Sequence, residues 1–189
     1  MKINLAFDID DVIVWTGDRQ TRQAFKNCGK KHYPQTTWNF AGYPQDVIDE
    51  YYRIDDTESL FRGGLCHKRI PYHLNNLIDS PKYKIIFVTG RYEHQLDGTV
   101  RQLLRHGINI KKEMIHIVGR NSKMEILKDF NPRLYFEDAP HHITECIKNG
   151  IKVVMITNNK TPWNHSLRGY VPNVAPGLIS ALRQNGIIK

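Results

Sequence analysis

Residues 2–14 read Lys-Ile-Asn-Leu-Ala-Phe-Asp-Ile-Asp-Asp-Val-Ile-Val. The apolar run up to residue 7 predicts a short strand, and three carboxylates follow it directly, on Asp8, Asp10 and Asp11. Like charges this close together repel one another and lose solvation near a buried strand, so they are most stable around a cation. The stretch therefore predicts a metal site at a strand end, and a solvated acidic turn is the alternative.

Apolar strands alternate with helices from residue 83 onward. The predicted strands cover 85–88, 114–118, 134–136 and 151–156, and the predicted helices cover 95–106, 123–130, 141–149 and 176–184. Such alternation predicts an α/β fold with a doubly wound parallel sheet, covered by helices on both faces. Ligands of such sheets bind at the carboxyl ends of the strands.

The segment 15–82 differs in composition, because it is rich in aromatic residues and is interrupted by prolines. Helical spacing appears in 44–52 and 71–77, each with a proline placed as in a first helical turn. We therefore expect a core domain formed by 1–14 and 83–189, with a small helical cap inserted as 15–82.

Composition bounds the class of protein. The chain has 189 residues, of which 40% are apolar and 24% charged, which predicts one globular core and excludes a disordered, collagen-like or coiled-coil chain. No run of 18 apolar residues occurs, so we expect a cytoplasmic protein without a membrane partner. The three cysteines have neither disulfide-framework nor zinc spacing.

The net charge of +8 would attract anions such as phosphates or nucleotides. The basic residues are scattered in pairs, which favours a solvated surface over a stripe that binds nucleic acid. A small phosphorylated molecule is therefore the expected partner, and nucleic acid is the less favoured one.

Polar residues follow nearly every predicted strand. Thr89, Gly90 and Arg91 follow the strand predicted at 85–88, and Glu137 and Asp138 follow the strand predicted at 134–136. Lys123 opens the helix before the fourth strand, within reach of the same crevice. Carboxylates for Mg²⁺, a hydroxyl donor and cations together fit phosphoryl chemistry, in which they neutralise charge on the phosphoryl group.

In this order, the motifs resemble the four motifs of the haloacid dehalogenase superfamily of phosphatases. The motifs are Phe-Asp8-Ile-Asp10-Asp11-Val, Phe-Val-Thr89-Gly-Arg91, Lys123 and Phe-Glu137-Asp138-Ala-Pro, and the leading positions are separated by 81, 34 and 14 residues. One departure is Asp11, which stands where many members have glycine. Aspartate tolerates such a turn better than most residues do.

The resemblance implies a role for each catalytic residue. Asp8 would be the nucleophile that forms an aspartyl-phosphate, and Asp10 the general acid that protonates the leaving oxygen and then activates water. Thr89 would donate a hydrogen bond to a phosphoryl oxygen. Lys123 would neutralise the charges of the phosphoryl group and of the nucleophile.

The resemblance also implies a Mg²⁺ site. Asp8, Asp138 and the backbone carbonyl of Asp10 would bind the ion, and Glu137 would assist directly or through water.

A looser resemblance points to the substrate. The pieces 37–40, 59–61 and 160–164 look like features of the 5'(3')-deoxyribonucleotidase group, which implies a nucleoside monophosphate or its deoxy form as substrate. Trp38 and Phe40 point in opposite directions in an extended chain, so we expect one to pack inward and the other to face the cleft. Each aromatic residue could instead belong to the core of the cap.

Three further residues are candidates for substrate binding, namely Gly90, Arg91 and Arg120, and the two arginines could contact a phosphate. For Arg91 a structural ion pair is the alternative. His141 and His142 are expected at a surface or a helix start, without a role in the site.

Other functions stay open. A polynucleotide end phosphatase or another small-molecule phosphatase would share these motifs, as would a phosphotransferase, because the acceptor is not encoded in them. A noncatalytic nucleotide-binding module is the alternative from another class. A P-loop kinase and a Rossmann dehydrogenase are disfavoured, because neither glycine-rich motif occurs.

Overall fold

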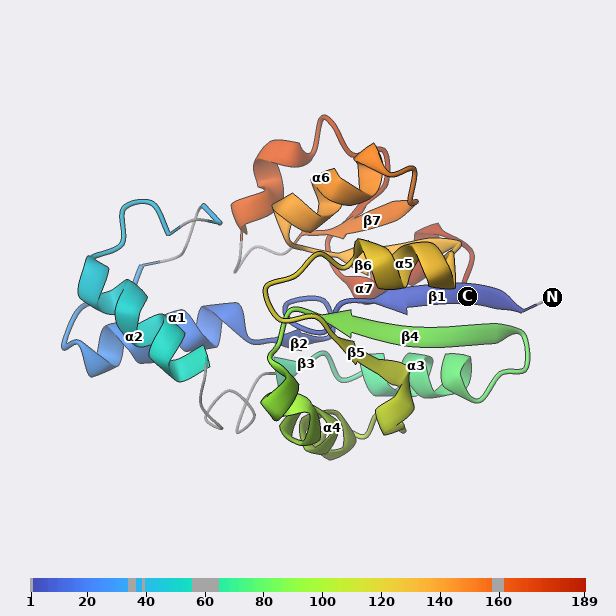
Figure 1. Ribbon diagram of the computed structural model, residues 1–189, viewed down its shortest axis with the longest axis horizontal. Coiled ribbons are helices and arrows are strands. Elements are labelled where there is room, and N and C mark those ends of the chain that lie inside the picture. Colours follow the sequence, from blue (N-terminus) through green and yellow to red (C-terminus); the bar gives the residue numbers. More distant parts are fainter. Residues whose placement is uncertain (1, 34–36, 39, 56–64, 158–161) are drawn as a thin grey trace.

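A six-stranded parallel sheet forms the centre of the protein in the computed structural model, which describes residues 2–33, 37–38, 40–55, 65–157 and 162–189. The strand order is β5-β4-β1-β6-β7-β8 (Figure 1), and its strand pairs are all parallel. The strands are β1 (Ile3–Phe7), β4 (Tyr83–Thr89), β5 (Ile115–Ile117), β6 (Leu134–Glu137), β7 (Val153–Ile156) and β8 (Val174–Ala175).

Helices cover both faces of this sheet. The core helices are α3 (Ile70–Ile78), α4 (Leu96–Arg105), α5 (Met124–Phe130), α6 (Pro140–Lys148) and α7 (Leu178–Gln184). Helices α3, α4 and α7 share one buried cluster with one face of the strands, whereas α5 and α6 share another cluster with the opposite face. The prediction of a doubly wound α/β fold is confirmed.

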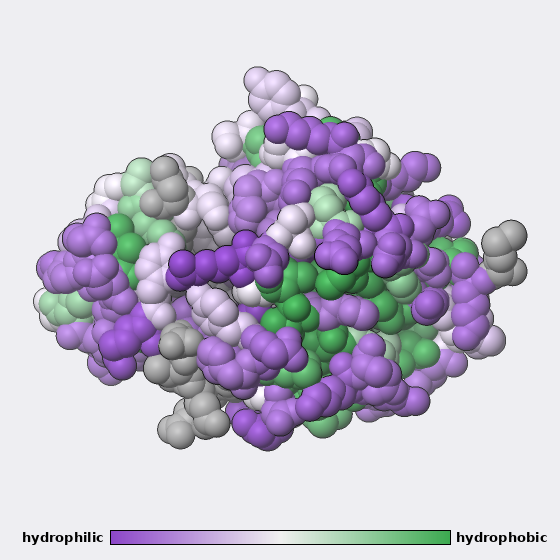
Figure 2. Space-filling view, viewed as in Figure 1, coloured by the Kyte–Doolittle hydropathy of each residue, from purple (hydrophilic) through white to green (hydrophobic). Residues whose placement is uncertain are grey.

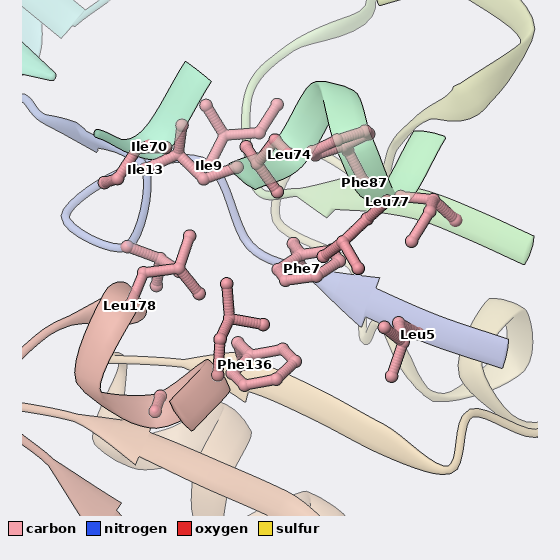
Figure 3. Packing of buried hydrophobic residues seen from close by; sticks show 14 of the residues in the cluster. Leu5, Phe7, Ile9, Ile13, Ile70, Leu74, Leu77, Phe87, Phe136 and Leu178 are labelled. Carbon is pink, nitrogen blue, oxygen red and sulfur yellow. The ribbon is translucent and has the colours of Figure 1, made fainter. Parts of the chain in front are cut away.

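Alternation of side chains along β1 assigns its residues to these two clusters. Leu5 and Phe7 point into the cluster with α3 and α7, and Ala6 points into the other. The ring of Phe7 stacks with those of Phe87 and Phe136, with centroid distances of 5.8 Å and 4.7 Å (Figure 3). Leu5, Ala6 and Phe7 are fully buried, and they face both clusters, which explains why this part of β1 is apolar throughout.

The segment after β1 leads away from the sheet. β2 (Val14–Trp15) pairs antiparallel with β3 (Leu65–Cys66), and α1 (Gly17–Asn27) packs against α2 (Gln45–Asp55). These two helices lie beyond the carboxyl ends of the strands (Figure 1). They enclose a small core of their own around Phe25, Phe40 and Val47. The predicted helix 44–52 is confirmed as α2.

Helix α3 belongs to a different environment, although it lies inside the range 15–82. Its Ile70, Leu74 and Leu77 join the cluster of the sheet (Figure 3). The apolar contacts of α3 are therefore with the core sheet, and the pair of α1 and α2 is the part of that range with a separate core.

Hydrophilic side chains cover most of the face shown in Figure 2, including the surface of α1 and α2, and apolar side chains gather over β4 and β5. Among the described helices, none has both the length and the apolar character needed to cross a bilayer. Short 3-10 helices lie at Glu93–Gln95, Lys112–Met114 and Pro162–Leu167.

Candidate active site

The candidate site lies at the carboxyl ends of three neighbouring strands. β1, β4 and β6 are adjacent and parallel, so Asp8, Thr89 and Asp138 meet at one edge of the sheet. The backbone N–H of Asp8 donates to the carbonyl of Phe136 at 2.9 Å, which extends the β1–β6 pairing to the candidate nucleophile. A cleft of about 670 Å³ opens here, lined by residues of the sheet edge and of α1 and α2.

Lys123 lies at the floor of this cleft, where it is 2% exposed. It precedes α5, and its Nζ donates to Asp8 Oδ1 at 2.5 Å, to Glu137 Oε2 at 2.8 Å and to the Tyr135 hydroxyl at 3.0 Å. Burial disfavours the charged amine, but the carboxylates of Asp8 and Glu137 outweigh it and raise the pKa of Lys123. The lysine is therefore a charged group that compensates two buried carboxylates.

Glu137 is fully buried and is held on both of its oxygens. Oε2 accepts from Lys123 and from the Tyr135 hydroxyl, and Oε1 accepts the backbone N–H groups of Asp138 and Ala139, each at 2.9 Å. Burial acts against its charge, but Lys123 lowers the pKa of Glu137 to about 2. Glu137 is therefore an ionised carboxylate that shapes the turn after β6.

Three carboxylates form the candidate metal centre. Asp8, Glu137 and Asp138 each offer an oxygen, and these oxygens lie within 4.8 Å of one another. Burial raises the pKa of Asp8 to about 8 and raises the pKa of Asp138 well above its usual range. These carboxylates are costly to ionise without a neighbouring cation, and all of their donor atoms are oxygens. Both properties fit a hard divalent cation such as Mg²⁺.

Asp10 is held apart from that cluster by other partners. Arg91 donates to both of its oxygens, from Nε at 2.9 Å and from Nη2 at 2.7 Å, and Thr16 Oγ1 donates to Oδ1 at 2.7 Å. Burial would raise the pKa of Asp10, but the guanidinium of Arg91 lowers it overall. The carboxylate of Asp10 is thus occupied by Arg91 and Thr16. Asp10 would therefore contact a metal through its backbone carbonyl.

The last residue of β4 and the residues that follow it lie at the same edge of the sheet. Thr89 is fully buried, with its Oγ1 3.5 Å from Asp10 Oδ2, and it accepts the backbone N–H of Arg91 at 3.4 Å. Gly90, Arg91 and Arg120 line the cleft. Arg91 is 4% exposed and forms an ion pair with Asp10, as the structural alternative for this residue predicts. Arg120 instead donates from Nε to the hydroxyl of Tyr92 at 3.2 Å.

Trp38 and Phe40 differ in exposure. Phe40 is 8% exposed and packs in the core of α1 and α2, with its ring centroid 4.7 Å from that of Tyr51. Trp38 is 40% exposed, and its ring contacts those of His141 and Trp163. Both side chains line the cleft. The pieces 59–61 and 160–161, together with Asn39, lie outside the described residues.

Several residues that line the cleft are not predicted from the sequence. They are Thr16, Gln20, Tyr51, Tyr52, Asp55, Tyr92, His141 and His142, and they are joined there by Trp163 of the piece 160–164. The two histidines do begin helix α6, as expected, but that helix start faces the cleft. The helical spacing of 44–52 would indicate that Tyr51 and Tyr52 share an element, yet nothing local shows that its end reaches the site.

Asp11 occupies the position where a glycine is common. Its φ of 56° is left-handed, as the turn after β1 requires, and its Oδ2 accepts the backbone N–H of Gly17 at 2.9 Å. The side chain therefore connects the turn after β1 to the start of α1, the first helix beyond the sheet.

Comparisons with solved structures place this fold. The chain matches a haloacid dehalogenase-like family hydrolase from Streptococcus pneumoniae with a TM-score of 0.65 and 14% identity, over 97% of this chain and 98% of that one. It matches a HAD family hydrolase from Deinococcus radiodurans R1, solved with bound phosphate and sodium, with a TM-score of 0.65 and 12% identity, over 100% and 98%. It matches a candidate HAD hydrolase from Bacillus subtilis, bound to magnesium, with a TM-score of 0.62 and 13% identity, over 98% and 99%.

No protein-family model and no curated protein matches the sequence. The structural matches cover nearly the whole of each chain, so the likeness includes the helices beyond the sheet edge as well as the sheet. The protein therefore has the α/β fold of the haloacid dehalogenase-like hydrolases.

Proposed function

We propose that the protein is a Mg²⁺-dependent phosphomonoesterase that acts on nucleoside or deoxynucleoside monophosphates through an aspartyl-phosphate on Asp8. The observation that carries this proposal is the contact of Lys123 with Asp8 at the floor of a cleft that also holds Asp10, Glu137 and Asp138. One carboxylate beside a buried amine, with a second acid nearby, is the arrangement that nucleophilic phosphoryl transfer requires.

Each group has a definite task in this reaction. A carboxylate oxygen of Asp8 attacks phosphorus, and the bond from phosphorus to the ester oxygen breaks. The ester oxygen takes a proton from Asp10, which must first bind that proton from solvent, because, against the effect of burial, Arg91 lowers the pKa of Asp10 in the free protein. Asp10 then takes a proton from water, which attacks the phosphorus of the aspartyl-phosphate and releases inorganic phosphate and free Asp8. Lys123 and the Thr89 hydroxyl stabilise the negative charge on the phosphoryl oxygens.

The metal ion would be held by Asp8, Asp138 and the carbonyl of Asp10, with Glu137 adjacent. When bound, Mg²⁺ would supply positive charge that partly neutralises the phosphoryl oxygens beside Asp8. The structurally similar hydrolase from Bacillus subtilis was solved with magnesium, which supports this choice of ion.

The shape and lining of the cleft support a nucleotide as substrate. Its volume of about 670 Å³ lies within the usual range for sites that take small molecules. Aromatic side chains contribute to its lining: Trp38, Phe40, Tyr51, Tyr52, Tyr92 and Trp163. An aromatic wall together with a phosphate-binding floor suits a molecule with a flat base at one end and a phosphate at the other.

The test is release of inorganic phosphate from a panel of ribonucleoside and deoxynucleoside monophosphates and p-nitrophenyl phosphate, with Mg²⁺ or with EDTA. We expect the nucleotides to react fastest and EDTA to abolish the reaction. A protein that hydrolyses p-nitrophenyl phosphate but no nucleotide would retain the proposed chemistry and contradict the proposed substrate.

The net charge of +8 favours a second candidate, a polynucleotide end phosphatase. A 3'-phosphorylated oligonucleotide in the same panel tests it. This alternative requires faster release from the oligonucleotide than from mononucleotides, together with an affinity that falls steeply as salt increases.

A further inference from the structure

Trp163 contacts one of the candidate metal ligands through its ring nitrogen. Its Nε1 donates to Asp138 Oδ2 at 3.1 Å, and the tryptophan is only 6% exposed. The indole N–H is a donor only, and a buried carboxylate oxygen without a donor is costly. The hydrogen bond therefore limits rotation of the Asp138 carboxylate, which is one of the three groups of the candidate metal centre.

The next residue holds the backbone of the same ligand. Asn164 is fully buried, and its Nδ2 donates to the carbonyl of Asp138 and to that of Ile156, each at 2.7 Å. Consecutive residues of one 3-10 helix thus restrain both the side chain and the main chain of Asp138. That helix follows β7 in the chain, so only the fold brings it to the metal centre.

The indole ring is itself held from two further sides. The ring of Trp38 meets it edge to face, with a centroid distance of 5.3 Å and an interplanar angle of 78°. On another side lies Gly17, where an added Cβ would come within 2.7 Å of the ring carbon Cη2. The absence of a side chain at the start of α1 therefore allows the close approach that seats Trp163.

We propose that Trp163 is a positioning residue for metal binding: its N–H orients the Asp138 carboxylate before the ion arrives. This inference rests on the proposed function, because it assumes a cation at Asp8 and Asp138. Removal of a partner that orients a metal ligand typically weakens metal affinity by roughly 10- to 100-fold. Trp163→Phe keeps an aromatic ring and removes the donor, so it isolates this effect.

The experiment is calorimetric titration of the metal-free full chain with Mg²⁺. We expect Trp163→Phe to weaken binding by about 10-fold or more. Trp15→Phe is the matched control, since it also removes one indole N–H but lies in β2 and is not among the residues that line the cleft. It should leave the Mg²⁺ affinity unchanged.

The outcomes separate this inference from the proposed function. Wild-type affinity in Trp163→Phe would overturn the positioning role and leave the metal site intact. Absence of Mg²⁺ binding by the wild-type chain would overturn both.

A second measurement does not depend on the folding of Trp163→Phe. The chain has three tryptophans, so the double variant Trp15→Phe, Trp38→Phe leaves Trp163 as the only indole. Its emission should change as Mg²⁺ is added, with half-saturation at the calorimetric Kd, because the charge at its hydrogen-bond partner changes. An emission that stays constant while Mg²⁺ binds would contradict the proposal.

Discussion

Arg91 donates two hydrogen bonds to Asp10, one to each carboxylate oxygen, at 2.9 Å and 2.7 Å. This bidentate pair is among the strongest geometries available between such side chains. A further contact, from Nη1 to Thr99 at 3.0 Å, fixes the guanidinium to α4. The proposed general acid at the end of β1 is thus oriented by a residue that closely follows the end of β4.

Removing Arg91 should change the pH profile of the reaction. Burial raises the pKa of Asp10 and Arg91 lowers it, so Arg91→Gln should raise the pKa of Asp10. The limb of the profile of kcat/KM that Asp10 governs should therefore move to higher pH, together with a loss of activity. Arg120→Gln is the control, because Arg120 pairs with Tyr92 and not with Asp10. If the kcat/KM profile of Arg91→Gln has its limbs at the same pH values as that of wild type, Asp10 is not the group that governs this limb.

Lys123 should be essential for stability as well as for activity. Lys123→Met leaves the buried carboxylates of Asp8 and Glu137 without their counter-ion, which costs about 3–5 kcal/mol in comparable buried pairs. Urea unfolding in EDTA measures this cost. The matched control is Lys112→Met, which breaks the exposed pair with Asp97 and should change stability little. Similar losses for the two variants would mean that burial does not govern the effect.

Gly17 should not tolerate a side chain. A Cβ at this position would come within 2.6 Å of Asp11 Oδ2 and 2.7 Å of the Trp163 ring. Gly17→Ala should therefore lower the free energy of unfolding by roughly 1–3 kcal/mol, since crowding in a packed site forces its neighbours to shift. Gly169→Ala, where no atom lies within 4 Å of the added carbon, serves as the control in the same urea series. Equal stability of Gly17→Ala and wild type would contradict the close packing.

His142 should make the protein sensitive to acid. Burial lowers the pKa of His142 to about 3, below its unfolded value of 6.5. Between these two pH values the unfolded chain binds a proton at His142 that the folded chain does not bind. The stability contributed by neutral His142 is present above pH 6.5 and is lost as the pH falls from 6.5 toward 3.

Replacing His142 with glutamine tests this dependence. The difference in unfolding free energy between wild type and His142→Gln should shift against wild type as the pH is lowered over that window. Urea unfolding of both proteins in EDTA at several pH values between neutrality and the acid end of the window measures it. A difference that is independent of pH would show that His142 does not titrate in the way described.

The sheet and the residues at its strand ends were predictable from sequence because parallel strands buried on both faces are continuous apolar runs. The residues that follow such runs meet at one edge, so the sequence alone places Asp8, Thr89 and Asp138 together. Lys123 was predictable for a related reason, since it opens the helix that leads into β6. Its contact with both Asp8 and Glu137 follows from that connection.

Contacts between segments distant in sequence could not be predicted in this way. Trp163 reaches Asp138 across 25 residues, and Gln20 donates to Asp55 across 35, and neither separation leaves a periodic signal. The range 15–82 had a distinct composition, but composition does not reveal that α3 packs with the sheet whereas α1 and α2 enclose a separate core. These distinctions depend on tertiary packing.

The central claim is that Asp8 is the nucleophile, and phosphate release by Asp8→Asn tests it most directly. The amide keeps the size of the side chain but cannot form the aspartyl-phosphate. With a nucleoside monophosphate and saturating Mg²⁺, we expect kcat to fall by at least about 1000-fold, while the variant retains the fold measured by circular dichroism. Phosphate release by Asp8→Asn at the wild-type rate would contradict the account.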